Sequence, residues 1–216
     1  MLKRTNDLVL RLEQLKPGNG IHPVDSDRRV PAVVGDSLVD VPAAALAFEY
    51  ADRELLTQRT TSPGRWEDGT PNRGGVRLDV LLANLDDRTP IAAEVKIARD
   101  MDPFFALVQA LTCAAHLATP NQYERLRRHV FRGRFREPAV APQLDVYVLF
   151  VDSSTHGAYM GHLTAAAPEV AKRLLRYEAV TQSVRRIAGL DIELQHAGSL
   201  ASRVRWAWEP APASRG

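Results

Sequence analysis

The sequence predicts an α/β protein, because apolar segments with the features of strands alternate with segments that have the periodicity of helices. Residues 75–82 and 90–97 are two short apolar strands, and the polar turn between them is rich in Asn, Asp and Pro. Residues 102–117 are expected to form a helix, and the apolar run at 143–151 a buried central strand. With 216 residues, the chain is long enough to bury a full core and is most simply one domain with additions.

The N-terminal residues 1–40 are expected to form an extension of the core. Residues 6–16 place three Leu side chains on one face of a short amphipathic helix, which Pro17 and Gly18 end. The rest of this extension is loop-like in composition, with a candidate short strand at 31–34.

Residues 41–152 are expected to form the core itself. A helix from about Val41 to Leu56 is expected first, and residues 55–61 are a candidate first strand. The helix at 102–117 follows the two central strands. Its expected apolar stripe consists of Phe104, Leu107, Val108, Leu111 and Ala115.

Residues 153–209 are expected to pack on this core as a helix and closing strands. The helix runs from Pro168 to Ala188 and is ended by Gly189. Its expected inward residues include Val184 and Ile187, and its outward residues include Arg185 and Arg186. The closing strands are expected at residues 190–195 and 203–209. Residues 210–216 form a tail with a composition that is typical of disordered segments.

Asp79, Glu94 and Lys96 are charged residues on two otherwise apolar strands. Because side chains alternate along a strand, Asp79 shares a face with Arg77, and Glu94 shares a face with Lys96. A turn centred at residues 86–87 pairs residues whose numbers sum to 173. The hairpin therefore places Asp79 opposite Glu94, and Arg77 opposite Lys96.

Two carboxylates on directly opposed positions, with Cβ atoms roughly 5 Å apart, repel each other. A shared proton, a nearby Arg or Lys, or a divalent cation that binds oxygens of both would neutralise them. Mg²⁺ or Mn²⁺ suits this oxygen-rich site better than zinc, since no Cys or His stands at ligand spacing. Lys96 would then orient or deprotonate a water for attack on phosphorus. The alternative interpretation is a cross-strand Glu/Arg/Lys ion-pair cluster on an exposed face.

The helix after these strands carries Gln109 near its second turn, in the run Gln-Ala-Leu-Thr-Cys. An acidic residue on one strand, Glu-x-Lys on the next and then a Gln on a helix resembles the PD-(D/E)XK nuclease superfamily, and the Gln helix is similar to that of its RecB-type members. This resemblance implies a restriction-endonuclease-like αβββαβ core, with a mixed central sheet flanked by helices. It also implies Mg²⁺-dependent hydrolysis of nucleic-acid phosphodiester bonds.

The resemblance also implies roles for individual residues. Asp79 and Glu94 look like metal ligands, together with the backbone carbonyl of Val95. Lys96 looks like the residue that positions or activates water, and Gln109 like the helix residue that contacts the site.

Many members also have a Glu on the helix before the sheet, which here would be Glu49 or Glu54. Glu49 is preferred as an additional catalytic and metal-binding residue, because apolar residues surround it in the better-patterned part of the helix. A surface Glu49–Arg53 pair at i, i+4 spacing is the alternative.

The densest basic region belongs to an expected helix at 119–136, with Thr119 as its cap and Pro120 at its first position. Arg side chains pair with phosphates and aromatic rings stack on exposed bases, so this region and Arg77 are expected to bind nucleic acid. The alternative is a solvated helix face with a few core aromatics. The arginines are Arg125, Arg127, Arg128, Arg132, Arg134 and Arg136, interleaved with Tyr123, Phe131 and Phe135.

The composition is compatible with this interpretation. A net charge of +2 and a pI near 8.8 permit nucleic-acid binding without demanding it. The lone Cys113 excludes an internal disulfide and fits a reducing cytoplasm, and the N-terminus lacks the long apolar run of a signal peptide or membrane span.

The sequence therefore predicts a cytoplasmic, metal-dependent deoxyribonuclease, with endonuclease favoured over exonuclease activity. The sequence leaves open whether the chain acts alone; the resemblance is also compatible with a homodimer or a subunit of a larger defence or repair assembly, and no membrane partner is expected. The alternative is a nuclease-fold protein that binds nucleic acid or assembles with partners without cleaving.

Overall fold

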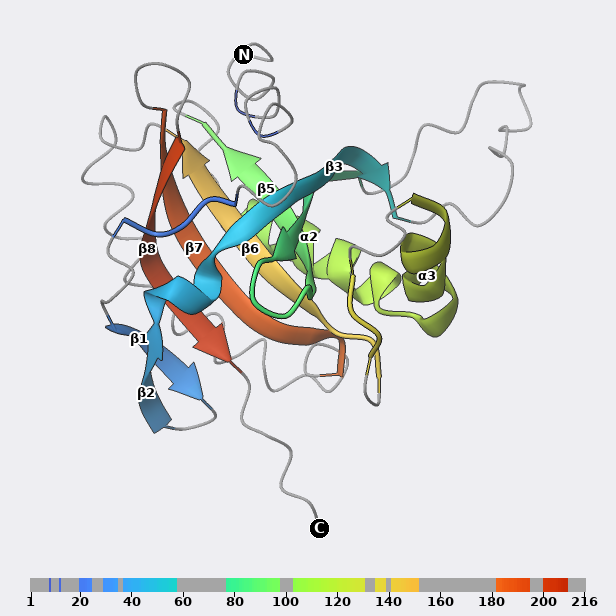
Figure 1. Ribbon diagram of the computed structural model, residues 1–216, viewed down its shortest axis with the longest axis horizontal. Helices are drawn as coiled ribbons and strands as arrows, with labels where there is room; N and C mark the ends of the chain where they lie inside the picture. Colours follow the sequence, from blue (N-terminus) through green and yellow to red (C-terminus); the bar gives the residue numbers. More distant parts are fainter. Residues whose placement is uncertain are drawn as a thin grey trace.

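A computed structural model of the chain describes residues 8, 12, 20–24, 29–34, 37–57, 77–97, 103–130, 135–138, 141–151, 182–194 and 200–209. The described strands form one eight-stranded sheet with the order β2-β1-β8-β7-β6-β5-β4-β3. Figure 1 shows this sheet strongly curved, with the β1–β2 hairpin at one end and helix α3 at the other. The α/β class expected from the sequence is confirmed.

The elements before the site are β1 (Arg29–Val34), β2 (Ser37–Pro42), the 3-10 helix η1 (Ala43–Leu46) and β3 (Phe48–Leu56). Those that surround it are β4 (Arg77–Asn84), β5 (Pro90–Lys96), α2 (Pro103–Leu117), α3 (Pro120–Arg125) and the π-helical turn η2 (Leu126–Val130). The remaining strands are β6 (Leu144–Val151), β7 (Val184–Leu194) and β8 (Leu200–Glu209).

The centre of the sheet is mixed. β3, β4 and β5 are antiparallel neighbours, whereas β6 pairs in parallel with both β5 and β7. A parallel pair needs a crossover connection, and α2 lies in the connection from β5 to β6 and packs on both strands. The candidate strand at 31–34 is confirmed within β1.

The register expected for the β4–β5 hairpin is confirmed. Val80 pairs with Ala93 and Leu82 with Ile91, and both pairs of numbers sum to 173. The turn is closed by Asn84, whose Oδ1 accepts hydrogen bonds from the backbone N–H groups of Asp86 and Asp87 at 2.9 and 3.3 Å. The hairpin therefore forms as local turn chemistry and alternation predict.

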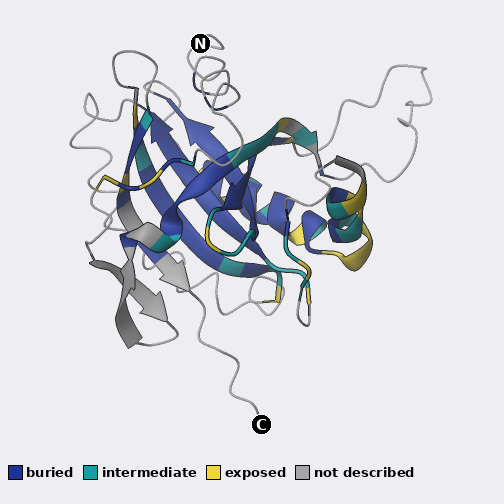
Figure 2. Cartoon of the chain, in the orientation of Figure 1, coloured by how far each residue is buried: buried dark blue, intermediate teal, exposed yellow. Residues whose placement is uncertain are grey.

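The sheet has a core on each face. The α2 side contains apolar residues of β4, β5 and β6 packed against Ala106, Ala110 and Ala114, whose small side chains let the helix approach closely. The opposite core contains Leu8 and Leu12, both helical and buried, packed with Phe48 and Tyr147. Figure 2 shows the central strands buried almost throughout, as expected for strands covered on both faces.

The α2 helix occupies its expected range, but its buried stripe differs from the prediction. Val108 and Ala115 are exposed, whereas Ala106, Ala110 and Cys113 are buried. The helix contacts the sheet through its smallest side chains, because these allow the closest packing.

The prediction of a helix from Val41 to Leu56 is wrong. The segment forms the end of β2, the short η1 and then β3, which pairs with β4 from Phe48↔Asn84 to Leu56↔Arg77. Pairing with a strand that lies later in the chain outweighs the local helical pattern.

The helix expected from Pro168 to Ala188 is wrong over its last five residues, which belong to β7; residues 168–181 lie outside the described residues. A register shift between Leu144 and Asp145 of β6 leaves Arg185 as an extra residue between Val184 and Arg186. Val184 and Ile187 therefore both face the α2 side. This bulge produces the three-residue apolar spacing that indicated a helix.

Candidate functional site

Asp79 and Glu94 meet at the end of the β4–β5 hairpin that lies away from its turn. The paired register extends to Val80↔Ala93 and stops there. Beyond it, the backbone N–H of Asp79 donates to Glu94 Oε1 at 3.4 Å, and the backbone N–H of Val95 donates to Asp79 Oδ2 at 3.0 Å. Each carboxylate thus accepts a hydrogen bond from the backbone of the other strand, so the two carboxylates converge.

Glu94 is 1% exposed, whereas Asp79 is only partly buried. Burial, followed by the charge of Asp79 and a side-chain hydrogen bond with it, raises the pKa of Glu94 to about 9. Glu94 therefore holds a proton at neutral pH.

Lys96 lies on the same face of β5 as Glu94. Ala93 and Val95, the residues on either side of Glu94, belong to the core on the opposite face, and side chains alternate along a strand. Its positive charge acts to lower the pKa of Glu94, although burial outweighs it. The Lys96 Nζ lies 5.8 Å from the centroid of the Phe105 ring on α2. The ammonium group therefore stands between the carboxylates and the helix.

Gln109 connects α2 to the strand that carries Asp79. Its Nε2 donates to the backbone carbonyl of Arg77 at 2.9 Å, two residues before Asp79. The Gln109 side chain thus binds the backbone at the first residue of β4. Arg77 itself is exposed at this end of the strand.

Sequence reasoning missed a polar cluster beside Glu94. Thr57 Oγ1, at the end of β3, lies 3.3 Å from His116 Nδ1 and 4.0 Å from Cys113 Sγ. Burial, followed by the charge of Glu94, raises the pKa of Cys113 to about 12, so the thiol stays protonated. Gln109, Cys113 and His116 follow one another at helical spacing on α2, and this spacing was the available signal.

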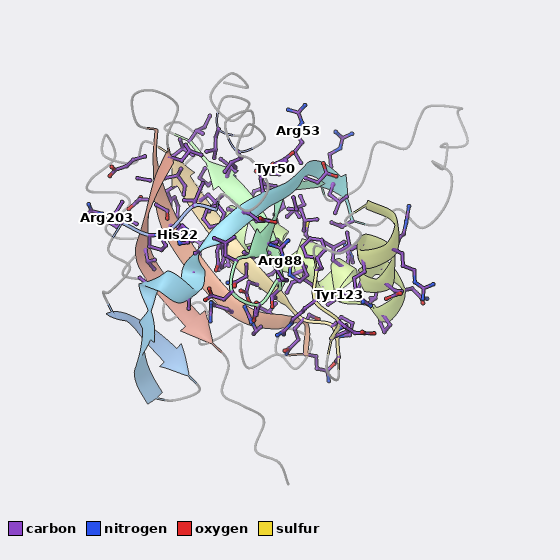
Figure 3. The ribbon with its side chains drawn as sticks, viewed as in Figure 1. His22, Tyr50, Arg53, Arg88, Tyr123 and Arg203 are labelled. Carbon is purple, nitrogen blue, oxygen red and sulfur yellow. The ribbon has the colours of Figure 1, made fainter. Side chains whose placement is uncertain are left out.

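Glu49 does not belong to this site, so its predicted role as a ligand on a helix is wrong. It lies on β3 opposite Ala83, four residues from Asp79 along β4, which corresponds to roughly 13 Å. Its Oε1 accepts a hydrogen bond from Arg88 Nη2 at 2.7 Å. The i, i+4 helical pair with Arg53 does not form either, and Figure 3 shows Arg53 pointing outward from β3.

Glu54, the alternative to Glu49, is level with Asp79 in the backbone register of β3 and β4. β3 pairs Arg53 with Val80 and Leu55 with Leu78, so Glu54 stands opposite Asp79 in the register.

The basic region is largely engaged in ion pairs. Arg127 and Arg128 both bind Glu124, and Arg136 Nη1 lies 3.4 Å from Asp87 Oδ2. Arg125 is exposed on α3, whereas Arg132 and Arg134 lie outside the described residues.

The aromatic residues of this region that the structure describes are in the core. Tyr123, labelled in Figure 3, and Phe135 are buried on the α2 side of the sheet, and the Tyr123 hydroxyl donates to the Arg136 carbonyl at 3.1 Å. Their expected role in stacking on bases is therefore wrong.

The two arginines expected on the outer face of a helix are also engaged. Arg185 donates to both carboxylate oxygens of Asp145, at 2.8 and 2.6 Å, and also binds Asp87. Arg186 is buried and donates to the Ala45 carbonyl at 2.7 Å. The strand assignment of β7 explains why both side chains are directed into the protein.

Within the described residues, no group of three or more His, Cys, Asp and Glu side chains is arranged to hold a metal ion. The donors at the site are the Asp79 and Glu94 carboxylates, with the Val95 carbonyl on the same strand as Glu94. No helix in the part of the chain that the structure describes is long and apolar enough to cross a membrane. Comparison of the chain with protein-family models, curated proteins and solved structures gives no match.

Proposed function

We propose that this protein is a divalent-metal-dependent nuclease that hydrolyses phosphodiester bonds, with DNA as the favoured substrate, at Asp79, Glu94 and Lys96. The observation that carries the proposal is the pair of opposed carboxylates where the β4–β5 pairing ends, with Lys96 on the same face. A structural ion-pair cluster would compensate charge with charge, whereas these two carboxylates face each other, and burial together with the charge of Asp79 raises the pKa of Glu94 to about 9 despite the nearby Lys96.

The order of elements supports a restriction-endonuclease-like core. Three antiparallel strands, β3, β4 and β5, are followed by α2 and the parallel strand β6, which agrees with the βββαβ part of the αβββαβ order. The helical residues Leu8 and Leu12 precede these strands and pack on the face opposite α2. They replace the segment 41–56 as the candidate for the first helix of that order.

The donor set fits a hard cation. The Asp79 and Glu94 carboxylates and the Val95 carbonyl supply oxygens, and the Cys113 thiol is protonated. Mg²⁺ or Mn²⁺, when bound here, would supply positive charge to a phosphate oxygen and acidify a coordinated water.

The other residues then have distinct roles. Glu94 must release its proton before it can act as a ligand. Lys96, which is nearly buried beside it, would hold the attacking water by a hydrogen bond and stabilise the negative charge that develops on the phosphate. Gln109 is a positioning residue, since it holds the backbone at Arg77 just before Asp79.

The test compares two buried glutamates of the same sheet, Glu94 and Glu49. Glu94→Gln keeps the size of the side chain but removes the ligand charge, and we expect it to abolish Mg²⁺- or Mn²⁺-dependent cleavage of plasmid and oligonucleotide DNA. Glu49→Gln, outside the site, is expected to cleave as the wild type does. Thermal unfolding of both variants verifies that they fold.

The outcome also separates the proposal from its alternative. Wild-type protein that binds DNA but cleaves neither DNA nor RNA with either metal would instead support a role in binding or assembly. Equal cleavage by Glu94→Gln and wild type would contradict the proposed site.

A further inference from the structure

The α2 helix exposes an aromatic ring beside the candidate site. Phe105 is 62% exposed and Val108, one turn away on the helix, is 55% exposed. In contrast, the apolar side chains on the face of α2 that packs on the sheet, such as Leu107 and Leu111, are buried. An exposed Phe forgoes the free energy of burying its ring.

Two contacts place the Phe105 face of α2 next to the site. The Lys96 Nζ lies 5.8 Å from the ring centroid, within the range of a cation–π interaction. Gln109, four residues further along α2, is bonded to the Arg77 carbonyl at 2.9 Å. The Phe105 face of α2 therefore borders the strand ends that carry Asp79, Glu94 and Lys96.

The surroundings of Phe105 favour a nucleic acid over an apolar partner. Lys96 places positive charge next to the ring, which matches a phosphate next to a base. Aromatic side chains bind single strands by stacking on bases, which any base sequence permits. A base within a duplex already stacks on its neighbours, so only an unpaired nucleotide presents a free face to the ring.

We propose that Phe105 is a stacking platform for an unpaired base next to the scissile phosphate, so that the preferred substrate is single-stranded or frayed nucleic acid. This inference rests on the proposed function for the identity of the site. It replaces Tyr123 and Phe135, whose rings are buried, with a ring that is accessible and adjacent to Lys96.

The experiment measures binding without cleavage. Fluorescence anisotropy in EDTA gives the Kd of the full chain for a labelled oligothymidylate and for a duplex of mixed sequence. Phe105→Ala removes the ring, Phe105→Trp retains a stacking surface, and Val108→Ala is the matched control at an equally exposed apolar position.

We expect Phe105→Ala to weaken oligothymidylate binding by about tenfold or more, in line with the loss of one base–aromatic stack. Phe105→Trp and Val108→Ala are expected to bind within about twofold of the wild type, and duplex binding is expected to change little in all three. Equal weakening for single strand and duplex, unchanged binding by Phe105→Ala, or no binding of oligothymidylate by the wild type would each overturn the inference.

Two further measurements distinguish the possible failures. If Phe105→Ala changes only the oligomeric state in sedimentation, the ring contacts another protein chain and the inference is overturned. Cleavage assays with Mn²⁺ separate this inference from the proposed function. Phe105-dependent binding without cleavage would contradict only the nuclease proposal, whereas cleavage with unchanged Phe105→Ala binding would contradict only the stacking platform.

Discussion

The two ends of the β4–β5 hairpin differ in how the charges of their carboxylates are compensated. At the turn end, two carboxylates have arginine partners: Asp87 binds Arg185 and Arg136, and Glu49 binds Arg88. At the open end, Asp79 and Glu94 face each other, and a proton on Glu94 relieves their repulsion.

This difference separates structural charges from candidate functional ones. A buried ion pair that is complete has little to gain from a ligand, whereas a protonated carboxylate pair can exchange its proton for a cation. Figure 3 labels Arg88 at the turn end, where it connects the hairpin turn to β3.

The largest expected difference is in cleavage. Lys96→Ala should reduce the rate of Mg²⁺-dependent DNA cleavage by roughly 10²–10³-fold, because a preorganised charge at the reacting phosphate is lost. Arg88→Ala removes a cation from the turn end and should leave the rate per folded molecule unchanged. Single-turnover rates on one oligonucleotide measure both, and equal losses would show that the two ends do not differ in function.

Ion pairs near the turn end of the hairpin should contribute most of the stability that comes from charged residues. Asp145 is buried and receives two hydrogen bonds from Arg185, so Asp145→Asn is expected to destabilise the fold by roughly 3 kcal/mol. Chemical denaturation measures this loss. Glu124→Gln, which disrupts the surface pairs with Arg127 and Arg128, is the control and should have a much smaller effect.

The open end should make stability fall as pH rises. The pKa of Glu94 is raised to about 9 in the folded protein from 4.5, so its stabilising contribution is complete below about pH 4.5 and is lost progressively toward pH 9. Glu94→Gln lacks this loss, and in EDTA at pH 8 it should exceed the wild type in unfolding free energy by several kcal/mol. At pH 5 the advantage should nearly vanish. A constant difference between pH 5 and 9 would contradict the assigned protonation.

The turn end should show the opposite pH dependence. Burial acts to raise the pKa of Asp87, but the charge of Arg185 and hydrogen bonds from Thr89 lower it below its ordinary value. Its contribution to stability is therefore present above about pH 3.8 and is lost as the pH falls through the lowered pKa. Asp87→Asn should remove this acid-side loss, as urea denaturation at pH 3 and pH 6 would reveal.

The smallest expected effect concerns Gln109. Gln109→Ala removes one hydrogen bond to a backbone carbonyl and should lower the cleavage rate by about tenfold or less, with little change in stability. Gln109→Glu, which cannot donate to the Arg77 carbonyl when ionised, should behave similarly. A full loss of activity in both variants would assign Gln109 a direct role in the reaction.

Local signals in the sequence predicted the parts of the fold that local chemistry determines. The Asn84 turn and the alternation along β4 and β5 fixed the register, and hence the meeting of Asp79 and Glu94. The apolar run of β6 and the Pro-initiated α2 were equally clear.

The errors arose where distant pairing decides the structure. β3 was predicted as a helix because its partner, β4, follows it only after a long connection. The first five residues of β7 were mistaken for the end of a helix, because a bulge at Arg185 gives them the spacing of a helix, whereas the strand predicted at 190–195 agrees with the rest of β7. The partners of Arg136 and Arg185, such as Asp87, lie far away in sequence, so a basic run gave no sign that it forms structural ion pairs.

The most direct test of the central claim is a crystal structure of the protein soaked in Mn²⁺, with anomalous diffraction data collected to locate the metal. The account predicts an anomalous peak bound by carboxylate oxygens of both Asp79 and Glu94, and its loss in Glu94→Gln crystals treated in the same way. Saturating Mn²⁺ with no peak between these two side chains, or a peak only at the turn end of the hairpin, would contradict it.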